Sequence, residues 1–321
     1  MAGILESWAR LASSSPPLGF IDWCLRGIGQ VVFQDNPLTG LFFLAAVAWA
    51  SLAGGAPEVL LGGVLAVVVA TAFALWLGVD RAAIGSGLAG YNAFLVGLAL
   101  PTFLPGGPLL WLYVVLGAAV SVVANLAVAE AGRRFAVASL TAAFVLVTWL
   151  MLLASHGFAG MSSMMAPSVD RIAESNPLDL VTFVTGVLKS ISQIFLKGSI
   201  VAALLFIAGL AVNSLPAALF AVGGAIAAVA FAHLFGAESE IVTQGLLGFS
   251  PVLTAVAVGT VFHKPGWRVG LYALLATLFT VVAQAATNAA LAPFAIPSLT
   301  APFVLTTWLF LLPALRLGSR D

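Results

Sequence analysis

The segment Ser139-Leu-Thr-Ala-Ala-Phe-Val-Leu-Val-Thr-Trp149 occurs twice in this chain. The second copy, Ser298-Leu-Thr-Ala-Pro-Phe-Val-Leu-Thr-Thr-Trp308, follows at an offset of 159 residues, close to half of the 321 residues of the chain. Nine of its eleven positions are identical, and a Thr, a Phe and a Trp recur in one register. Two unrelated apolar helices would share leucines by chance, but rarely these three side chains. The pair therefore indicates an internal duplication.

Two further blocks match in the same order and at nearly the same offset. Leu25-Arg-Gly-Ile-Gly-Gln-Val31 lies over Leu188-Lys-Ser-Ile-Ser-Gln-Ile194 at an offset of 163 residues. Gly87-Leu-Ala-Gly-Tyr-Asn-Ala-Phe-Leu95 lies over Gly245-Leu-Leu-Gly-Phe-Ser-Pro-Val-Leu253 at an offset of 158 residues. The sequence thus predicts two related halves.

The composition is that of an integral membrane protein. Hydrophobic residues make up 62% of the chain, charged residues 7%, and the mean hydropathy is +1.14. A soluble domain carries roughly 25% charged residues. Asp, Glu, Lys and Arg are absent from four long runs, 82–129, 135–169, 198–237 and 269–315. Several apolar runs exceed the roughly 18 residues that cross a bilayer as a helix.

Several functional classes find no support in the sequence. The single Cys24 excludes an internal disulfide and a cysteine metal site. No basic patch or nucleotide-binding motif suggests nucleic-acid binding or nucleotide-driven transport. No Ser/His/Asp set or metal-ligand spacing suggests an enzyme, and we expect no cofactor or metal. The N-terminal segment carries Glu6, Arg10 and a Ser/Pro break, which predicts a short amphipathic helix on the membrane rather than a cleavable leader.

We predict an all-α polytopic membrane protein of about ten transmembrane helices and two re-entrant half-helices. The half-helices are expected at 18–35 and 180–197. The spans are expected at 38–53, 57–79, 86–102, 108–129, 136–154, 199–213, 215–236, 242–261, 267–290 and 297–315. The predicted organisation is an N-terminal segment 1–17, repeat 1 at 18–154, a linker at 155–179, repeat 2 at 180–316 and a tail at 317–321.

Five spans per repeat is an odd number, so the second repeat is expected to be inverted. With the N-terminus inside, most basic residues fall on the cytoplasmic face, as the positive-inside rule requires: Arg10, Arg81, Arg133, Arg134, Lys264, Arg268, Arg316 and Arg320. Lys189 and Lys197 are the weak points, on or near the outer half-helix. We expect both termini in the cytoplasm and the protein in the inner or plasma membrane. Inverted repeats place a substrate pathway at their interface.

Two pairs of polar residues are candidates for that pathway. Gln30 and Gln193 each lie near the break of a half-helix, and an amide in apolar surroundings needs hydrogen-bond partners. A lone Thr in a membrane helix usually bonds its own helix or a neighbour. Because Thr141 and Thr300 recur with the same neighbours, lining of a pore is the favoured reading for them.

The chain resembles the urea transporter family over nearly its whole length. The resemblance is carried by Gln30-Val-Val-Phe-Gln-Asp-Asn-Pro-Leu-Thr-Gly40, by Gly87-Leu-Ala-Gly-Tyr-Asn-Ala-Phe-Leu-Val-Gly97, by Gly245-Leu-Leu-Gly-Phe-Ser-Pro-Val-Leu-Thr-Ala255 and by the two Ser-Leu-Thr segments. It implies passive, channel-type transport of urea, a homotrimer in the lipid bilayer, and one pore with a selectivity filter in each protomer.

The resemblance also implies roles for individual residues. Gln30 and Gln193 would lie at the two ends of the filter, and Thr141 and Thr300 would face its middle. Aliphatic side chains would line the slot: Val31, Ile194, Leu95 and Leu253. Phe33 matches the first aromatic residue of the family, and Phe195, displaced by one position, is a candidate for the second. Two departures are Leu196-Lys-Gly-Ser199 in place of Gln34-Asp-Asn-Pro37, and Ser250 in place of Asn92.

The residues themselves favour a neutral solute, because an ion or proton pathway normally shows an ionisable side chain at mid-depth. The nearest alternative is a channel for another small neutral solute, such as a short amide, ammonia or water. An ammonia channel would carry a paired histidine, and His156, His233 and His263 show no repeat relation. An ion-coupled secondary transporter is a further alternative, with Asp22, Asp35 and Glu58 as its only candidate sites.

Overall fold

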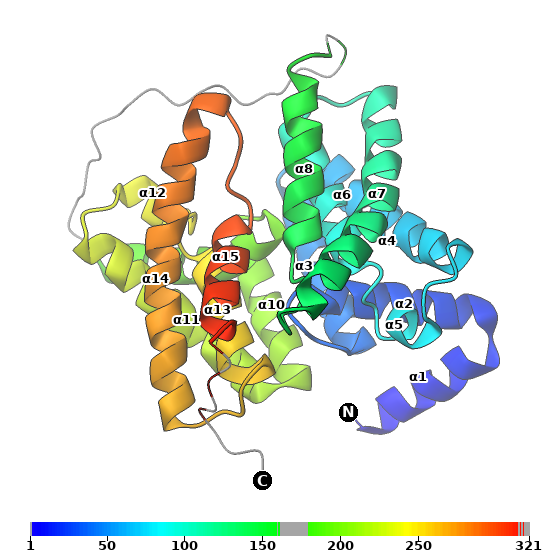
Figure 1. Ribbon diagram of the computed structural model, residues 1–321, viewed down its shortest axis with the longest axis horizontal. Coiled ribbons are helices and arrows are strands. Elements are labelled where there is room, and N and C mark those ends of the chain that lie inside the picture. The colour runs from blue at the N-terminus through cyan, green and yellow to red at the C-terminus, as the bar shows by residue number, and fades with distance from the viewer. Residues whose placement is uncertain (1, 159, 161–178, 314, 316, 318–321) are drawn as a thin grey trace.

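The computed structural model describes residues 2–158, 160, 179–313, 315 and 317, and every regular element in this part of the chain is helical. The first half comprises α1 Ala2–Ser14, α2 Pro16–Gln30, α3 Pro37–Ala53, α4 Pro57–Trp76, α5 Arg81–Gly85, α6 Tyr91–Phe103, α7 Pro108–Arg133 and α8 Ala142–Ser155. The second comprises α9 Leu180–Ser192, η2 Gln193–Phe195, α10 Ile200–Asn213, α11 Leu215–Leu234, α12 Ser239–Thr243, α13 Phe249–Val256, η3 Ala257–Val261, α14 Trp267–Leu291, η4 Ala292–Phe294 and α15 Ala301–Leu311. The all-α class is confirmed, and the two halves lie beside each other in Figure 1.

The helices begin where the sequence supplies caps. Asn36 precedes Pro37, and its side-chain oxygen accepts hydrogen bonds from the amides of Leu38 (2.9 Å) and Thr39 (3.4 Å). Proline suits the first turn because its missing N–H would have no partner there. At the matched position of the second half, Ser199 caps α10 by accepting from the amide of Ala202 at 3.3 Å. Different residues thus start α3 and α10 by the same mechanism.

The backbone repeats its unusual conformations at matched positions. Among the described residues, the non-glycine positions with positive φ form three pairs: Phe33 with Leu196, Ala136 with Ala295, and Leu140 with Leu299. The φ angles are 59° for both members of the first pair, 53° for the second and 50° for the third. Non-glycine residues rarely adopt this region. Agreement of six such residues in three pairs shows that the backbone turns in the same way in both halves.

Two glycines fix the approach of α2 and α9 to their neighbours. Gly87 has φ +83° and Gly245 has φ +75°, a region that favours glycine. A Cβ at Gly87 would collide with the backbone of Arg26 and Gly27, and one at Gly245 with the backbone of Lys189 and Ser190. The first glycine of the repeated Gly-Leu-Ala/Leu-Gly motif is therefore required for close packing.

The lengths of the helices leave the predicted span count open. In the part of the chain that the structure describes, four helices are long and apolar enough to cross a membrane: Pro57–Trp76, Pro108–Arg133, Leu215–Leu234 and Trp267–Phe294. A fifth is obtained if Leu180–Phe195 and Ile200–Asn213, bent by 72° at a short break, form one span. Other apolar helices are shorter: Pro37–Ala53, Tyr91–Phe103, Ala142–Ser155, Phe249–Val261 and Ala301–Leu311. Several expected spans begin with segments that are not continuous helix, so the count of about ten, and the re-entrant halves, stay predictions.

The two halves pack together through α3 and α10. Thr39 donates its hydroxyl to the carbonyl oxygen of Gly209 at 2.8 Å, across this contact. Asn213, at the end of α10, donates to the side-chain oxygen of Gln34 at 2.8 Å and accepts from the amide of Asn36 at 3.1 Å. Phe195 and Phe206 stack with ring centroids 4.3 Å apart, beside Phe43 of the first half. Apolar and polar contacts therefore join α3 to α10.

The segment before repeat 1 is helical, as expected, and α1 is tied to α2. The indole N–H of Trp8 donates to Asp22 at 2.7 Å, and Arg26 forms ion pairs with Asp22 and Asp35, each at 2.6 Å. Most of the predicted linker 155–179 and of the tail 317–321 lies outside the described residues. At the edge of the linker, hydrogen bonds from Thr182 to the exposed Asp179 lower the pKa of that carboxyl.

Candidate functional site

The two paired threonines meet at the boundary between the halves. The hydroxyl oxygens of Thr141 and Thr300 lie 2.7 Å apart, and both side chains are buried, with 2% exposed. Each threonine occupies the position just before a helix, α8 for Thr141 and α15 for Thr300. The hydrogen bond uses one hydroxyl proton, so the pair keeps a second proton to donate and lone pairs to accept.

The tryptophans of the duplicated segment brace the same boundary reciprocally. The indole N–H of Trp149 donates to the carbonyl oxygen of Pro297 at 2.8 Å. That of Trp308 donates to the carbonyl oxygen of Ala138, also at 2.8 Å. Trp149 of α8 thus binds the segment before α15, and Trp308 of α15 binds the segment before α8. The two bonds hold α8 and α15 in a matched arrangement around the threonine pair.

A cavity of about 510 Å³ opens against Thr141. Four of the ten site residues predicted from the sequence line this cavity: Gln30, Val31, Phe33 and Thr141. The other lining residues are Leu88, Tyr91, Ala129, Val137, Ala138, Ser139, Leu140, Val261 and Phe262. This lining holds no carboxylate, ammonium, guanidinium or imidazole group. The cavity can therefore receive a polar solute without pairing a charge.

The two predicted glutamines hold equivalent positions. Gln30 donates its amide N–H to the carbonyl oxygen of Ser86 at 2.8 Å, and Gln193 donates to that of Gln244 at 3.1 Å. Ser86 and Gln244 are themselves matched at an offset of 158 residues. Because a backbone carbonyl only accepts, these bonds orient each side chain and leave its amide oxygen as an acceptor. Gln30 is one of the residues that line the cavity.

Three phenylalanines meet beside this cavity. The ring of Phe33 lies edge-on to Phe262, with centroids 6.1 Å apart, and edge-on to Phe303, with centroids 6.2 Å apart. These distances and angles are typical of favourable aromatic pairs. Phe33 and Phe262 line the cavity, so flat apolar surfaces adjoin its polar groups.

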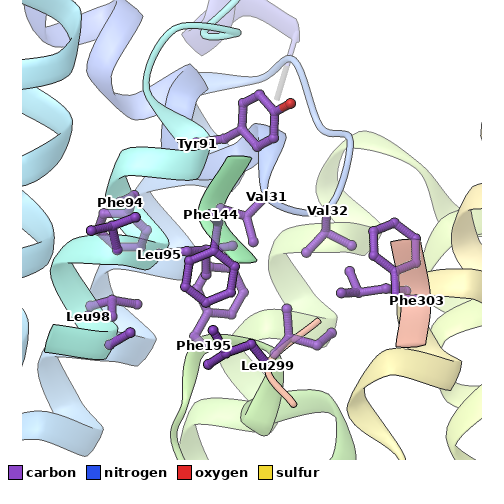
Figure 2. Packing of buried hydrophobic residues seen from close by; sticks show 14 of the residues in the cluster. Val31, Val32, Tyr91, Phe94, Leu95, Leu98, Phe144, Phe195, Leu299 and Phe303 are labelled. Carbon is purple, nitrogen blue, oxygen red and sulfur yellow. The ribbon is translucent and has the colours of Figure 1, made fainter. Parts of the chain in front are cut away.

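The remaining predicted site residues belong to the apolar core. Leu95, Leu253 and Phe195 are fully buried and Ile194 is 3% exposed, and none of them lines the 510 Å³ cavity. Figure 2 shows side chains of both halves in this core, among them Leu95 and Phe144 from the first and Phe195 and Phe303 from the second. Thr300 and Gln193 do not line the cavity either, although Thr300 is hydrogen-bonded to the lining residue Thr141.

Residues 21–315 match the sequence profile of the urea transporter family. The chain belongs to the urea transporter family. It is similar to Urea transporter 1 of Ovis aries, with 30% identity over 330 aligned positions that cover 97% of this chain and 82% of the sheep protein. Urea transporter 1 of Rattus norvegicus is 30% identical over 320 positions, with the same coverage. The resemblance inferred from the motifs is thereby confirmed.

For this urea transporter family member, the structure adds a residue that the prediction did not include. Leu196, rather than Phe195, has the backbone conformation of Phe33, with φ 59° at both residues. Like Phe33, Leu196 is half-buried against the core. The offset of 163 residues that aligns Gln30 with Gln193 also aligns Phe33 with Leu196, so the signal was present in the sequence.

Tyr91 and Phe262 are further lining residues that the prediction left out. Tyr91 belongs to the Gly-Tyr-Asn block that carried the family resemblance, and its hydroxyl donates to the carbonyl oxygen of Leu140 at 2.7 Å. Phe262 follows a π-helical turn at Ala257–Val261, and no repeated motif marks it. Only the packing of the second half against the first brings it to Phe33.

Proposed function

We propose that this chain is a passive channel for urea, with the 510 Å³ cavity as one vestibule and the Thr141–Thr300 pair as its narrowest point. The observation that carries the proposal is the 2.7 Å contact between two matched threonines, one of which lines an uncharged cavity. Membership of the urea transporter family supports the substrate. The family is one of transporters, which agrees with a function other than catalysis.

The chemistry of urea suits the groups around this path. Urea is planar and neutral, with four N–H donors and one carbonyl acceptor. Entering a membrane protein removes its bonds to water, and each bond left unmade costs about 1–3 kcal/mol. The Gln30 amide oxygen and the Thr141 and Thr300 hydroxyls would replace those bonds. The rings of Phe33 and Phe262 would cover the flat faces of the molecule.

The absence of charged side chains from the cavity lining favours passive transport. The residues that line the cavity carry no group that would bind a sodium ion or exchange a proton. Two helix N-termini, those of α8 and α15, converge at the threonine pair, and their positive ends disfavour cations. We infer that flux follows the urea gradient and ignores membrane potential. Another small neutral solute is the alternative, and it is tested in the same experiment.

We further infer that the two halves are inverted repeats with the pathway at their interface, as in other membrane transporters of this construction. The reciprocal bonds of Trp149 and Trp308 and the three pairs of positive φ angles support this arrangement. A homotrimer, a location in the inner membrane and cytoplasmic termini are part of the same proposal. Exposed apolar side chains such as Trp76 and Leu234, at 77% and 79%, support contact with lipid.

Purified protein in liposomes tests the proposal by stopped-flow light scattering. Urea permeability above that of empty vesicles is expected, and equality with empty vesicles rejects the proposal. Acetamide, ammonia and water are measured on the same vesicles. A permeability gain for one of these solutes with none for urea would favour the alternative function.

Two variants locate the pathway. Thr141→Trp and Thr300→Trp are expected to abolish urea flux, because in each variant the larger side chain would block the proposed narrowest point of the path. Leu150→Trp on α8 is the matched control, since Leu150 is 67% exposed and should tolerate the larger side chain. Size-exclusion chromatography shows whether the assembly is preserved. Normal flux in both threonine variants would place the constriction elsewhere.

A further inference from the structure

The polar groups that pack against the segments carrying Thr141 and Thr300 differ between the two halves. In the first half, the side-chain oxygen of Asn125 accepts two hydrogen bonds, from the amide of Asn92 at 3.1 Å and from the hydroxyl of Ser139 at 2.8 Å. The hydroxyl of Tyr91 lies 3.0 Å from the same oxygen, but its single proton goes to a closer acceptor. The carbonyl oxygen of Leu140 accepts from Tyr91 at 2.7 Å. Direct side-chain contacts therefore satisfy these two acceptors.

Asn92 also holds the start of α8. Its side-chain oxygen accepts from the backbone amide of Phe144 at 3.0 Å. Phe144 lies in the first turn of α8, where amides have no partner within the helix. Thr141 stands just before this turn, so the Asn92 carboxamide fixes the backbone that presents Thr141 to Thr300.

The second half lacks both donors. Phe249 stands in place of Tyr91 and has no hydroxyl, and Ser250 stands in place of Asn92 and is shorter. Gln284 takes the place of Asn125, and its amide nitrogen donates to Asn288 at 3.0 Å and also to Ser298. Both amide hydrogens are thereby used. The oxygen of Gln284 and the hydroxyl of Ser250 have no hydrogen-bond partner among the described residues, although both residues are fully buried.

Two backbone groups complete the set. The carbonyl oxygen of Leu299 and the amide of Phe303 correspond to those of Leu140 and Phe144, and no donor or acceptor among the described residues meets them. The neighbouring hydroxyls do not compete, because Thr254 donates to the carbonyl of Ser250 and Thr280 donates to the carbonyl of Ala276 at 2.7 Å, with the Thr254 hydroxyl 3.0 Å away. Four polar groups thus converge by correspondence with the first half: two acceptors, one donor and one hydroxyl that can do either.

We propose that this set, the Ser250–Gln284–Leu299–Phe303 site, binds one buried water molecule. A water can donate to the Gln284 oxygen and the Leu299 carbonyl and accept from the Phe303 amide and the Ser250 hydroxyl. Buried waters typically make about three hydrogen bonds to otherwise unsatisfied groups, with a range of two to four. A buried polar group left unpaired costs about 1–3 kcal/mol. One water in this site would satisfy four such groups.

The water would position the second threonine. Through the amide of Phe303 it would hold the first turn of α15, and hence Thr300, as the Asn92 carboxamide holds α8 and Thr141. One half of the constriction is then fixed by a side chain and the other by an exchangeable solvent molecule. Urea need not bind for this to hold, so the inference stands independently of the proposed substrate.

A high-resolution crystal structure of the full chain tests the site directly. Density for one water within hydrogen-bond distance of the Ser250 hydroxyl and the Gln284 oxygen is expected. In Ser250→Asn, the carboxamide should replace the water, contact the Phe303 amide and raise the melting temperature. A wild-type map in which Gln284 and Ser250 meet protein partners, with no density between them, would overturn the proposal.

The first half supplies the matched variant. Asn92→Ser removes the carboxamide and should create an equivalent water beside Asn125 and the Phe144 amide, with a lower melting temperature than the wild type. If Asn92→Ser does not fold, the wild-type and Ser250→Asn maps still decide. A Ser250→Asn variant that melts below the wild type and leaves the Phe303 amide unpaired would count against the site.

Discussion

Thr141 and Thr300 each stand at the position just before a helix, α8 and α15 respectively. Neither side chain caps its own helix, and both hydroxyls are directed to each other at 2.7 Å. A threonine within a membrane helix usually donates to a carbonyl one turn earlier, as Thr71, Thr277 and Thr287 do here. The position before the helix removes that option and leaves the hydroxyls available to a solute.

Replacing either threonine by valine removes the hydroxyl, keeps the size of the side chain nearly unchanged, and should slow the passage of urea. We expect Thr141→Val and Thr300→Val each to lower urea permeability about 5-fold to about 100-fold, since a lost hydrogen bond raises the barrier by about 1–3 kcal/mol. Thr148→Val on the same helix is the control. The Thr148 hydroxyl is buried without a partner among the described residues, so its removal should leave flux unchanged. Equal flux in all three variants would contradict a role for the threonine pair.

Phe33 and Leu196 share a backbone conformation but not a ring. Because a leucine covers less flat surface than a phenylalanine, we expect Phe33→Leu to raise the permeability of methylurea relative to urea. Leu196→Phe should lower the same ratio. The ratio is measured by stopped-flow light scattering, with Phe294→Leu as the control because that ring is 59% exposed. An unchanged ratio in both variants would show that these residues do not select by shape.

At the scale of elements, α8 and α15 are each hydrogen-bonded to the segment that precedes the other helix. Trp149 of α8 binds the carbonyl of Pro297, and Trp308 of α15 binds the carbonyl of Ala138. Tyr113 of α7 and Tyr272 of α14 repeat the same relation within each half, donating to the carbonyls of Met151 and Phe310 at 3.3 Å and 2.7 Å. Aromatic side chains with one polar atom thus set the positions of both short helices.

The reciprocal tryptophan bonds should contribute equally. We expect Trp149→Phe and Trp308→Phe each to lower the free energy of unfolding by about 1 kcal/mol, the usual net value of one hydrogen bond. Trp267→Phe is the control, because that side chain is 73% exposed and the variant should melt like the wild type. The measurement is the melting temperature in detergent. A marked loss in only one of the two variants would contradict their structural equivalence.

At the scale of the whole molecule, the charged residues do not line the 510 Å³ cavity of the proposed path. Asp22, Arg26 and Asp35 bind one another near α1, and the cavity lining holds no acidic or basic side chain apart from the phenol of Tyr91. The two halves are held together by the α3–α10 contact and by the bonds at the threonine pair. A neutral solute therefore meets a neutral surface.

This distribution of charge predicts transport that ignores pH. Urea permeability should be constant between about pH 5 and about pH 7, a range that includes the ordinary pKa of histidine. An imposed proton gradient should also leave the flux unchanged. Both are measured on proteoliposomes, with empty vesicles at each pH as the control. A step in permeability over this range would indicate a titrating group on the path and would favour a coupled mechanism.

The amino-acid sequence alone determined the membrane class, the duplication and the identities of the paired polar residues. Identity at matched positions survives in a sequence whatever the fold, so Gln30, Gln193, Thr141 and Thr300 could be named in advance. It also determined the caps, such as Asn36 before Pro37, because these depend on residues that are neighbours along the chain.

Tertiary structure alone decided how the halves face each other. Hydropathy marks an apolar segment but not where its helix starts, so segments such as 137–140 and 297–299 were predicted within spans although they precede α8 and α15. The 2.7 Å contact of the threonines, the crossing of the tryptophans and the approach of Phe262 to Phe33 join residues distant in sequence. Their distances depend on packing between helices, which no local pattern records.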